Sequence, residues 1–295
     1  MSATFWSAFL DLKLKLKKNY GDSEAESIAQ WIIEAVSGFS NTQFVLNRFE
    51  LLSSGQKAQL KVYEQQLLAN RPVQYVLGTS YFYGLKLAVD ESVLIPRPET
   101  EELVDWCLHE VKNFSDPKLR ILDIGTGSGC IALALKSKMP DAEVYAVDCS
   151  EKALATAGKN AADNNLSIRF QQLDILNKKE WAHLPRFDVI ISNPPYITVE
   201  EQSTIAASVL DYEPHGALFV KDRDPLQFYK KIEAFAHGHL KLSGSLFLEL
   251  HAQFSDLTLA FYEERAWKTR LKNDMQGKER MLMAYRVKNH AQPEM

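Results

Sequence analysis

The chain has few cysteines and no long apolar run, and both absences exclude whole classes of protein. Only 3 of its 295 residues are cysteine, and none stands in a C-x-x-C pair. This usage excludes a disulfide scaffold and is typical of a reducing compartment. No run approaches the roughly 18 apolar residues that a membrane span needs, and the N-terminus lacks the basic and apolar segments of a secretory signal. We therefore expect a cytoplasmic protein without membrane attachment.

The chain also lacks a strong excess of charge of either sign. It has 34 Lys and Arg against 38 Asp and Glu, a net charge of −4, to which residues 1–73 contribute +1 and the rest −5. Because nucleic-acid binders usually present a basic surface, we expect no direct binding to nucleic acid. With 46% hydrophobic and 24% charged residues the composition is that of a globular protein, and the length suggests two domains.

The N-terminal part of the chain carries helical signals. Apolar residues at helical spacing predict helices over the opening segment and over 44–52 and 56–69, and Ser23-Glu24-Ala25-Glu26 has the spacing of a capping box that starts another helix. From residue 73 aromatic and β-branched residues with glycines between them predict a β-hairpin over 75–89.

The remainder alternates between strand and helix signals, which favours a doubly wound, mostly parallel α/β sheet. The last two strands are separated only by a turn around Gly277, so they are expected to finish the sheet as an antiparallel hairpin. We expect strands at 120–125, 143–148, 168–173, 187–192, 245–250, 267–273 and 280–287 and helices at 130–138, 151–164 and 225–236. The domains are therefore predicted as 1–72, a hairpin linker over 73–95, and 96–295.

Glycine is scarce, yet three of the 13 glycines fall within Gly125-Thr126-Gly127-Ser128-Gly129, between a strand and a helix. Asp148 ends the next strand, where a carboxylate can accept both hydroxyls of a ribose. Three interpretations compete: a tight strand–helix corner, a dinucleotide site, and a site for S-adenosyl-L-methionine. Cys130 stands where the dinucleotide motif needs its final glycine, which weakens the second. In the third, the methionine carboxylate would meet the helix N-terminus.

The strand over 187–192 runs directly into Asn193-Pro194-Pro195-Tyr196. This segment is either a rigid surface turn or part of a site at the carboxyl edge of the sheet. An amide or aryl amine nitrogen is a poor nucleophile because its lone pair is delocalised. The Asn193 side-chain oxygen and the Pro194 carbonyl could each accept one N–H of such a nitrogen and stabilise the positive charge that develops on it, while the Tyr196 ring stacks on the planar group.

The glycine loop resembles the signature of class I methyltransferases, which bind S-adenosyl-L-methionine. This resemblance implies a Rossmann-like, seven-stranded sheet with a terminal antiparallel hairpin, joined here to a small N-terminal helical bundle. Asp174, at the end of the third strand, then occupies the place that contacts adenine, with a strand-end cap as the alternative. Ile175 follows it, where many members of the narrower family named next have an aromatic ring near the adenine.

Nearly the whole chain resembles one family, the bacterial peptide-chain release factor glutamine methyltransferases. The most specific segment is Ile-Pro-Arg-Pro-Glu-Thr-Glu over 95–101. The other segments that carry the resemblance are 71–75, 82–85, 123–129, 193–196 and 274–280, with Asp148, Glu213, Glu249 and Gln253. His251 departs from a glycine that is common in the family.

The resemblance implies N5-methylation of the glutamine of a Gly-Gly-Gln motif in class I release factors, with S-adenosyl-L-homocysteine as the other product. It implies a substrate-recognition role for residues 1–72. The cofactor contacts carried over are Gly125, Thr126, Gly127, Ser128, Gly129, Asp148, Asp174, Ile175 and Asn193, and the substrate contacts are Asn193, Pro194, Pro195 and Tyr196.

The strand-end motif alone leaves a second function open, because DNA and RNA amino-methyltransferases share it. We expect a monomeric enzyme and no metal site. His237 and His239 form a pair only superficially, since no acidic or cysteine partner stands at ligand spacing, and we interpret them as a solvated helix end.

Overall fold

The computed structural model describes residues 3–112, 114, 118–220 and 224–286. The chain divides into two compact units. The first, the helical unit, contains residues up to Thr79 together with Ala206–Tyr212, and the second, the sheet unit, contains Ser80–Ile205 and the chain from Glu213 onward. The finer predicted borders at 72 and 95 stay a prediction.

The helical unit is built from short amphipathic helices around one apolar core. Its helices are α1 (Phe5–Leu16), α2 (Asp22–Ser37), α3 (Asn41–Asn47), α4 (Ser54–Leu68), α5 (Val73–Leu77) and α9 (Ala207–Tyr212). The side chains of Leu12, Leu16, Ile32, Ile33 and Leu67 are at most 1% exposed and fill the centre of this core. The core therefore contains side chains from α1, α2 and α4, which are separate in the sequence.

Three expectations for this unit were wrong in detail. The helix predicted over 44–52 is α3, which begins at Asn41 and ends at Asn47. Helix α2 begins at Asp22 after Gly21, with no side-chain cap, so the predicted Ser23 capping box does not form. Residues 75–77, predicted as strand, lie in α5, which starts after Pro72 and stops at Gly78 in the left-handed conformation (φ 65°). Tyr75 is buried. Its burial, together with the helix start after Pro72 and the helix stop at Gly78, outweighs the strand propensity of the segment.

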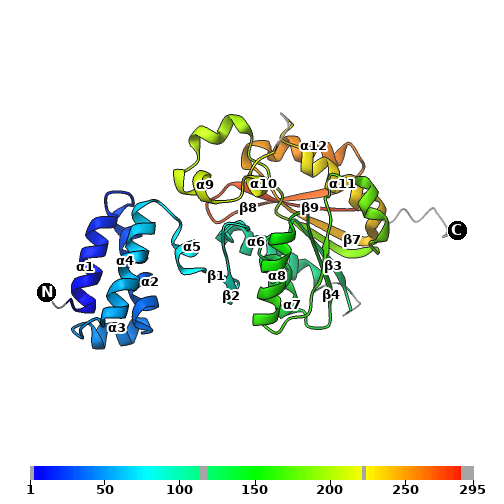
Figure 1. Cartoon of the computed structure of the whole chain (residues 1–295). Coiled ribbons are helices and arrows are strands. Elements are labelled where there is room, and N and C mark those ends of the chain that lie inside the picture. The colour runs from blue at the N-terminus through cyan, green and yellow to red at the C-terminus, as the bar shows by residue number, and fades with distance from the viewer. Residues whose placement is uncertain (1–2, 113, 115–117, 221–223, 287–295) are drawn as a thin grey trace. The chain divides into compact units, whose positions relative to one another are not determined.

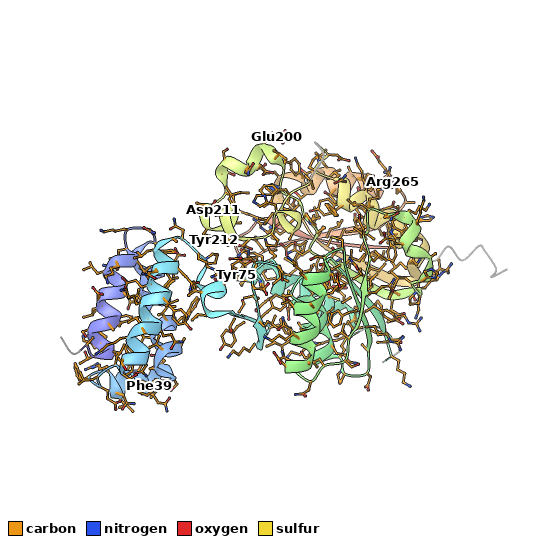
Figure 2. The ribbon with its side chains drawn as sticks, viewed as in Figure 1. Phe39, Tyr75, Glu200, Asp211, Tyr212 and Arg265 are labelled. Atoms are coloured by element: carbon orange, nitrogen blue, oxygen red, sulfur yellow. The ribbon has the colours of Figure 1, made fainter. Side chains whose placement is uncertain are left out.

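Helix α9 belongs to the helical unit although about 130 residues of the sheet unit precede it. In Figure 2 Tyr212 is labelled on this helix, and its hydroxyl donates a hydrogen bond to the carbonyl oxygen of Ala69 at 2.8 Å. The phenol lies near Tyr20 of the same unit, whose pKa is raised chiefly by burial. Nothing local in the sequence of 207–212 indicates this attachment.

The sheet unit has seven strands in the order β5-β4-β3-β6-β7-β9-β8. Figure 1 labels five of them, β3, β4, β7, β8 and β9. The first five in this order are parallel, and β9 runs antiparallel to both β7 and β8. The predicted doubly wound sheet with a terminal antiparallel hairpin is thus confirmed. The strands are β3 (Arg120–Ile124), β4 (Glu143–Asp148), β5 (Arg169–Gln172), β6 (Phe187–Ser192), β7 (Leu240–Glu249), β8 (Lys268–Asn273) and β9 (Glu279–Tyr285), with β1 (Thr79–Phe82) and β2 (Leu85–Ala88) forming a separate hairpin.

Both faces of the sheet are covered, because successive strand residues point to opposite sides. On β6, for example, Val189 and Ile191 pack on one face and Ile190 on the other. The first face is covered by α6 (Pro98–Val111), α7 (Cys130–Lys138) and α8 (Glu151–Asp163). The other is covered by α11 (Gln227–His239), α12 (Ser255–Glu263) and η1 (Lys178–His183), and η2 (Val199–Thr204), α10 (His215–Leu218) and η3 (Ala252–Phe254) complete the unit.

One strand is longer than predicted. β7 begins at Leu240 rather than at 245, and its pairing with β6 shifts register between Phe187 and Val189. Gly244 lies in the shifted stretch, where a Cβ would stand 2.8 Å from the carbonyl oxygen of Asp188. The close approach therefore requires glycine there. Within the described ranges, no helix is both long and apolar enough to cross a membrane.

Candidate active site

The predicted site residues follow the carboxyl ends of adjacent parallel strands. β3 and β6 are neighbours, and Ile124 pairs with Ser192, so the glycine loop after β3 and Asn193 after β6 start side by side. Ser192 strengthens the junction by donating its hydroxyl to the carbonyl oxygen of Ile124 at 2.7 Å. The strand order reverses between β3 and β6, which is where open α/β sheets bind ligands.

The loop from β3 to α7 depends on glycine at three positions. Gly125, Gly127 and Gly129 have φ values of 72°, 55° and 83°, a region that other residues rarely adopt. A Cβ on Gly129 would lie 3.2 Å from that of Ala157, whereas the Cβ positions of Gly125 and Gly127 have no heavy atom within 4 Å. The first two glycines thus leave open space beside the backbone, and the third allows close packing against α8.

Asp148, at the end of β4, closes on this loop. One carboxylate oxygen accepts a hydrogen bond from the backbone N–H of Gly127 at 2.9 Å, and the other accepts from that of Ser150 at 2.9 Å. Burial raises the pKa of the carboxyl group, and the backbone donors partly offset this rise.

Asp123, on β3, supports the loop from beneath, a role that the sequence did not reveal. Its side chain is fully buried and accepts hydrogen bonds from the hydroxyl of Thr126 at 2.6 Å and from the backbone N–H of Ala132 at 3.2 Å. Burial raises its pKa to about 7. In the sequence Asp123 was noted only as the first residue of the 123–129 segment that carries the resemblance.

Asn160, on α8, is a second supporting residue that the sequence did not reveal. Its amide donates to the carbonyl oxygens of Ser128 at 2.9 Å and Ala88 at 3.0 Å, and its oxygen accepts from the N–H of Ala88 at 2.6 Å. This fully buried side chain joins the glycine loop to β2.

Asp174 and Ile175 lie beyond β5, next to the end of β4. The Asp174 carboxylate accepts from the N–H of Leu176 at 2.9 Å, so it caps its own turn, as the alternative interpretation has it. Ile175 is 7% exposed and belongs to the core beneath the sheet, with its carbonyl oxygen accepting from Trp181 at 3.2 Å. Their contact with adenine stays a prediction.

Asn193 is held by a chain of side chains. Its Nδ2 donates to the hydroxyl of Thr100 at 3.1 Å, and that hydroxyl donates to Oε2 of Glu249 at 2.6 Å. Oε1 of Glu249 accepts from the Tyr196 hydroxyl at 3.2 Å. The fully buried Glu249 has a pKa raised to about 7 by desolvation. Thr100 and Glu249 were noted in the sequence only as part of a resemblance.

Tyr196 and the two prolines complete the segment. Pro194 is buried, while Pro195 and Tyr196 are half-buried. The Tyr196 ring meets the His251 ring edge to face, with centroids 5.6 Å apart. Nε2 of His251 also lies 2.8 Å from Oε1 of Glu201 on η2. The two side chains form an ion pair when the imidazole is protonated. His251, a departure from the family's glycine, thus packs beside the site.

The segment before α6 is fixed within the sheet unit. Glu213, 3% exposed, accepts from the N–H of Ile95 at 3.2 Å and pairs with the Arg97 guanidinium at 2.5 Å. Since α6 starts at Pro98, this clamp sets the position of Thr100. Glu99 accepts instead from the side chain of Gln276 at 3.3 Å.

The histidine pair ends α11, as interpreted from the sequence. The His239 ring stacks on Phe235 with centroids 4.3 Å apart, and His237 is exposed. In the part of the chain that the structure describes, no group of three or more His, Cys, Asp or Glu is placed to hold a metal ion.

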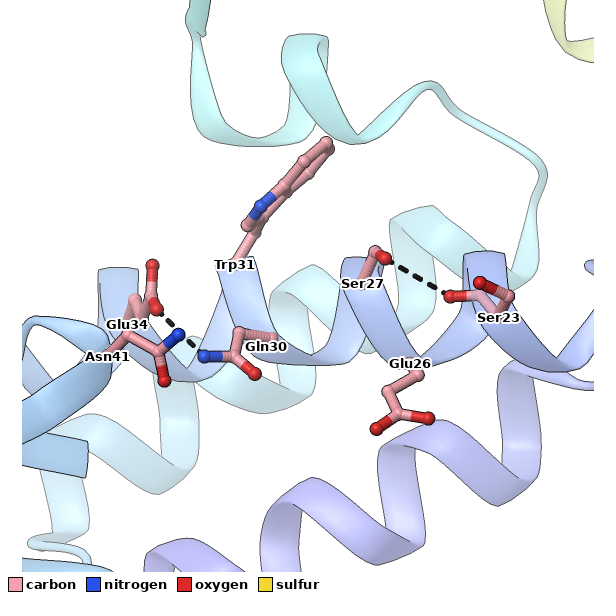
Figure 3. Close-up of a pocket in the computed structure, with 7 residues that line it drawn as sticks. All are labelled: Ser23, Glu26, Ser27, Gln30, Trp31, Glu34 and Asn41. Carbon is pink, nitrogen blue, oxygen red and sulfur yellow. Dashed lines mark hydrogen bonds between the residues drawn. The ribbon is translucent and has the colours of Figure 1, made fainter. Parts of the chain in front are cut away.

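A separate hollow lies along α2 of the helical unit (Figure 3). Trp31, 46% exposed, projects from this helix, and the side chain of Gln30 donates to Glu34 at 3.0 Å. Glu26 in the same hollow is paired with Lys13 at 2.6 Å. The residues that line it are Ser23, Glu26, Ser27, Gln30, Trp31, Glu34 and Asn41.

The sheet topology and the strand-end residues together define a class I methyltransferase fold. The family model described as "Methyltransferase small domain" matches residues 108–248, and the one described as "PrmC N-terminal domain" matches residues 8–78. The crystal structure of a methyltransferase from Pyrococcus furiosus superimposes with a TM-score of 0.51 at 18% identity, over 80% of this chain and 100% of that one. That likeness concerns the fold alone.

Sequence relatives place the chain in one family. A release factor glutamine methyltransferase from Flavobacterium psychrophilum is 43% identical over 89% of this chain and 92% of that protein. One from Bacteroides thetaiotaomicron is 36% identical over 93% of this chain and 98% of that protein. The chain belongs to the release factor glutamine methyltransferase family.

Proposed function

We propose that this protein methylates N5 of the glutamine in the Gly-Gly-Gln motif of class I peptide-chain release factors, with S-adenosyl-L-methionine as methyl donor. The observation that carries the proposal is the place of Asn193–Tyr196, directly beside the glycine loop at the switch point of the sheet, in a chain of this family. The relatives indicate that the substrate is a release factor, and the residues at the end of β6 indicate that the methyl acceptor is a planar nitrogen.

The residues beside the glycine loop fit such a donor. Open space next to Gly125 and Gly127 leaves room for a ligand against the backbone, and the Asp148 carboxylate beside Gly127 can accept hydrogen bonds from ribose hydroxyls. When bound, S-adenosyl-L-methionine supplies an electrophilic methyl group and leaves as S-adenosyl-L-homocysteine. The residues proposed to hold it are Gly125, Thr126, Gly127, Ser128, Gly129, Asp148, Asp174, Ile175 and Asn193.

The residues after β6 would bind and orient the acceptor amide. The side-chain oxygen of Asn193 and the carbonyl oxygen of Pro194 accept its two N–H groups, which stabilises the positive charge that develops on nitrogen. The Tyr196 ring holds the amide plane at about 3–3.5 Å from the attacked carbon. Full positioning of this kind compensates for the weak nucleophilicity of an amide nitrogen.

The test is methyl transfer from labelled S-adenosyl-L-methionine to a purified class I release factor, to the same factor with Gln→Ala in its Gly-Gly-Gln motif, and to nucleic acid. We expect label on the first substrate alone. Label on nucleic acid but not on the motif glutamine would overturn the proposal and favour an amino-methyltransferase of DNA or RNA. The net charge of −5 on the residues after 73 supports a protein substrate.

A further inference from the structure

A buried carboxylate, that of Glu249, is linked to two of the proposed acceptor-binding residues. It contacts Tyr196 directly and Asn193 through the hydroxyl of Thr100. Glu249 ends β7 and is 2% exposed, as is Thr100 on α6. Both oxygens of Glu249 are used, Oε2 by the Thr100 hydroxyl and Oε1 by the Tyr196 hydroxyl. The hydroxyl of Thr100 is the link between Glu249 and Asn193.

The direction of these hydrogen bonds follows from the chemistry of the groups. An ionised carboxylate only accepts, so the single hydroxyl proton of Thr100 must point to Glu249. The Thr100 oxygen can then only accept, and Asn193 must present its NH2 group to it. The Asn193 side-chain oxygen is thereby turned away from Thr100, and it accepts no hydrogen bond within residues 3–112, 114, 118–220 and 224–286.

We propose that Glu249 and Thr100 are positioning residues that fix the orientation of the Asn193 amide, so that its oxygen faces the acceptor nitrogen. This inference rests on the proposed function, because it assigns that oxygen the role of accepting an N–H of the substrate amide. The same carboxylate holds the Tyr196 hydroxyl, so one buried group sets both the acceptor oxygen and the aromatic ring.

The device works in one protonation state. If Glu249 is protonated, its O–H can donate to Thr100, and Thr100 can donate to the side-chain oxygen of Asn193. The amide then flips, and the oxygen needed by the substrate is occupied internally. An enzyme that uses this relay loses methyl transfer when Glu249 gains a proton.

The surroundings of Glu249 bring this titration close to neutral pH. Burial is the main cause of its raised pKa of about 7, against which the hydrogen bonds from Thr100 and Tyr196 and the charge of Arg280 on β9 act. Glu99 on α6 raises it further. Among the residues that the structure describes, Tyr229 on α11 and Cys130 on α7 also interact electrostatically with Glu249.

The first test replaces Thr100 by valine, which has the same shape without the hydroxyl. We expect kcat for release factor methylation to fall about 10- to 100-fold, as for a misplaced reacting group, with the Kd for S-adenosyl-L-methionine unchanged. Thr100→Ser restores the hydroxyl and should return kcat to within about threefold of the parent. Thr258→Val is the matched control, because the buried hydroxyl of Thr258 on α12 donates to the carbonyl oxygen of Phe254, at the end of the preceding η3, and to no group of the site.

The second test is the pH profile of kcat at saturating S-adenosyl-L-methionine. The parent should lose activity as pH falls through about 7, because the relay needs the carboxylate. Glu249→Gln should be about 10- to 100-fold slower, because the amide has only one acceptor oxygen for the two hydroxyls. It should also lack this acid limb, because an amide does not titrate in this range. Glu233→Gln, at the buried acceptor of Trp267, is the control and should keep the parental profile.

Each result bears on the relay separately from the proposed function. If the parent enzyme does not label the motif glutamine, the proposed function fails. If it does label it, but Thr100→Val retains parental kcat or the acid limb persists in Glu249→Gln, the relay is overturned. Circular dichroism and cofactor binding identify a variant that fails to fold, in which case Thr100→Ser and the pH profile of Glu249→Gln decide.

Discussion

The two units of the molecule treat polar groups in opposite ways. Every buried polar or charged residue among those the structure describes lies in the sheet unit, and the buried side chains of the helical unit are all hydrophobic. Helices α1, α3 and α4 satisfy their first N–H groups locally through capping boxes of Thr4, Ser40 and Ser53. Burying a polar group costs free energy unless it is hydrogen-bonded.

The difference locates the chemistry of the molecule. Three buried polar residues support the predicted site. Asp123 and Asn160 are hydrogen-bonded to the glycine loop. Glu249 is hydrogen-bonded to Thr100, which contacts Asn193. Charged pairs of the helical unit, such as Lys17 with Asp22, are exposed and contribute little to stability. The unit that contains the buried polar groups is therefore the one that contains the proposed catalytic site. Substitutions at this site in the sheet unit should change catalysis or cofactor binding, whereas substitutions in the helical unit should not.

The largest effect is expected for Asn193→Ala. This change removes the proposed acceptor for the substrate N–H, and we expect kcat to fall at least about 1000-fold. The half-buried position of Asn193 predicts little loss of fold. Single-turnover labelling of a release factor measures the first effect, and a near-parental melting temperature shows that the sheet unit is intact. Full activity in this variant would remove the proposed role.

Asp148→Asn is expected to act on the cofactor instead. Replacing the carboxylate weakens charge-assisted hydrogen bonds to a ribose, so the Kd for S-adenosyl-L-homocysteine should rise about 10- to 100-fold. Because burial raises the pKa of Asp148, parental affinity should begin to fall at a higher pH than for an exposed aspartate, and the variant should lack this fall. Calorimetric titration from about pH 4, close to the usual aspartate pKa, up to neutral pH measures both. Equal affinity in the two proteins would exclude a ribose contact.

The residues that the sequence predicted well are those with local signals. The strand at Phe187–Ser192 and the helix at Cys130–Lys138 are confirmed to the residue, because a buried apolar run bounded by glycine or asparagine needs no distant partner to be recognised. The glycine loop and the Asn-Pro-Pro-Tyr segment came from short motifs. Their placement on adjacent strands followed from the parallel topology.

The supporting residues had no such signal. Thr100 and Glu249 lie 149 residues apart, and Asn160 lies 72 residues from Ala88. Hydrogen bonds between distant segments leave no periodicity in the sequence, so only the folded chain reveals them. The attachment of α9 to the helical unit escaped prediction for the same reason.

Asp123→Asn should change how stability depends on pH. The pKa of Asp123 is raised to about 7 in the folded protein, so the folded state holds this proton more tightly than the unfolded chain does. Its contribution to stability is complete below the usual aspartate pKa of about 3.9 and is lost as pH rises through about 7. Relative to the parent, the variant should therefore gain about 4 kcal/mol in unfolding free energy between pH 4 and pH 8.

Urea unfolding of both proteins across that range measures the difference. A constant difference would mean that Asp123 titrates like an exposed carboxylate. Asp22→Asn in the helical unit is the contrast, because Lys17 and Lys13 lower the pKa of that exposed carboxyl group. The difference between this variant and the parent should stay nearly constant between pH 4 and pH 8. It should change in the opposite direction only below about pH 4, where the parent loses the stabilisation from this carboxylate as pH falls.

The smallest effect is expected at the hollow on α2. Trp31 is 46% exposed and stands in this hollow of the helical unit, the part predicted to recognise the protein substrate. Exposed tryptophans often carry binding energy at interfaces, so Trp31→Ala should raise KM for the release factor about 3- to 10-fold and leave kcat and cofactor affinity unchanged. Phe49→Ala, an exposed aromatic outside the hollow, is the control. An unchanged KM would remove the hollow from recognition, whereas a lower kcat would mean that the two units do not divide binding and chemistry.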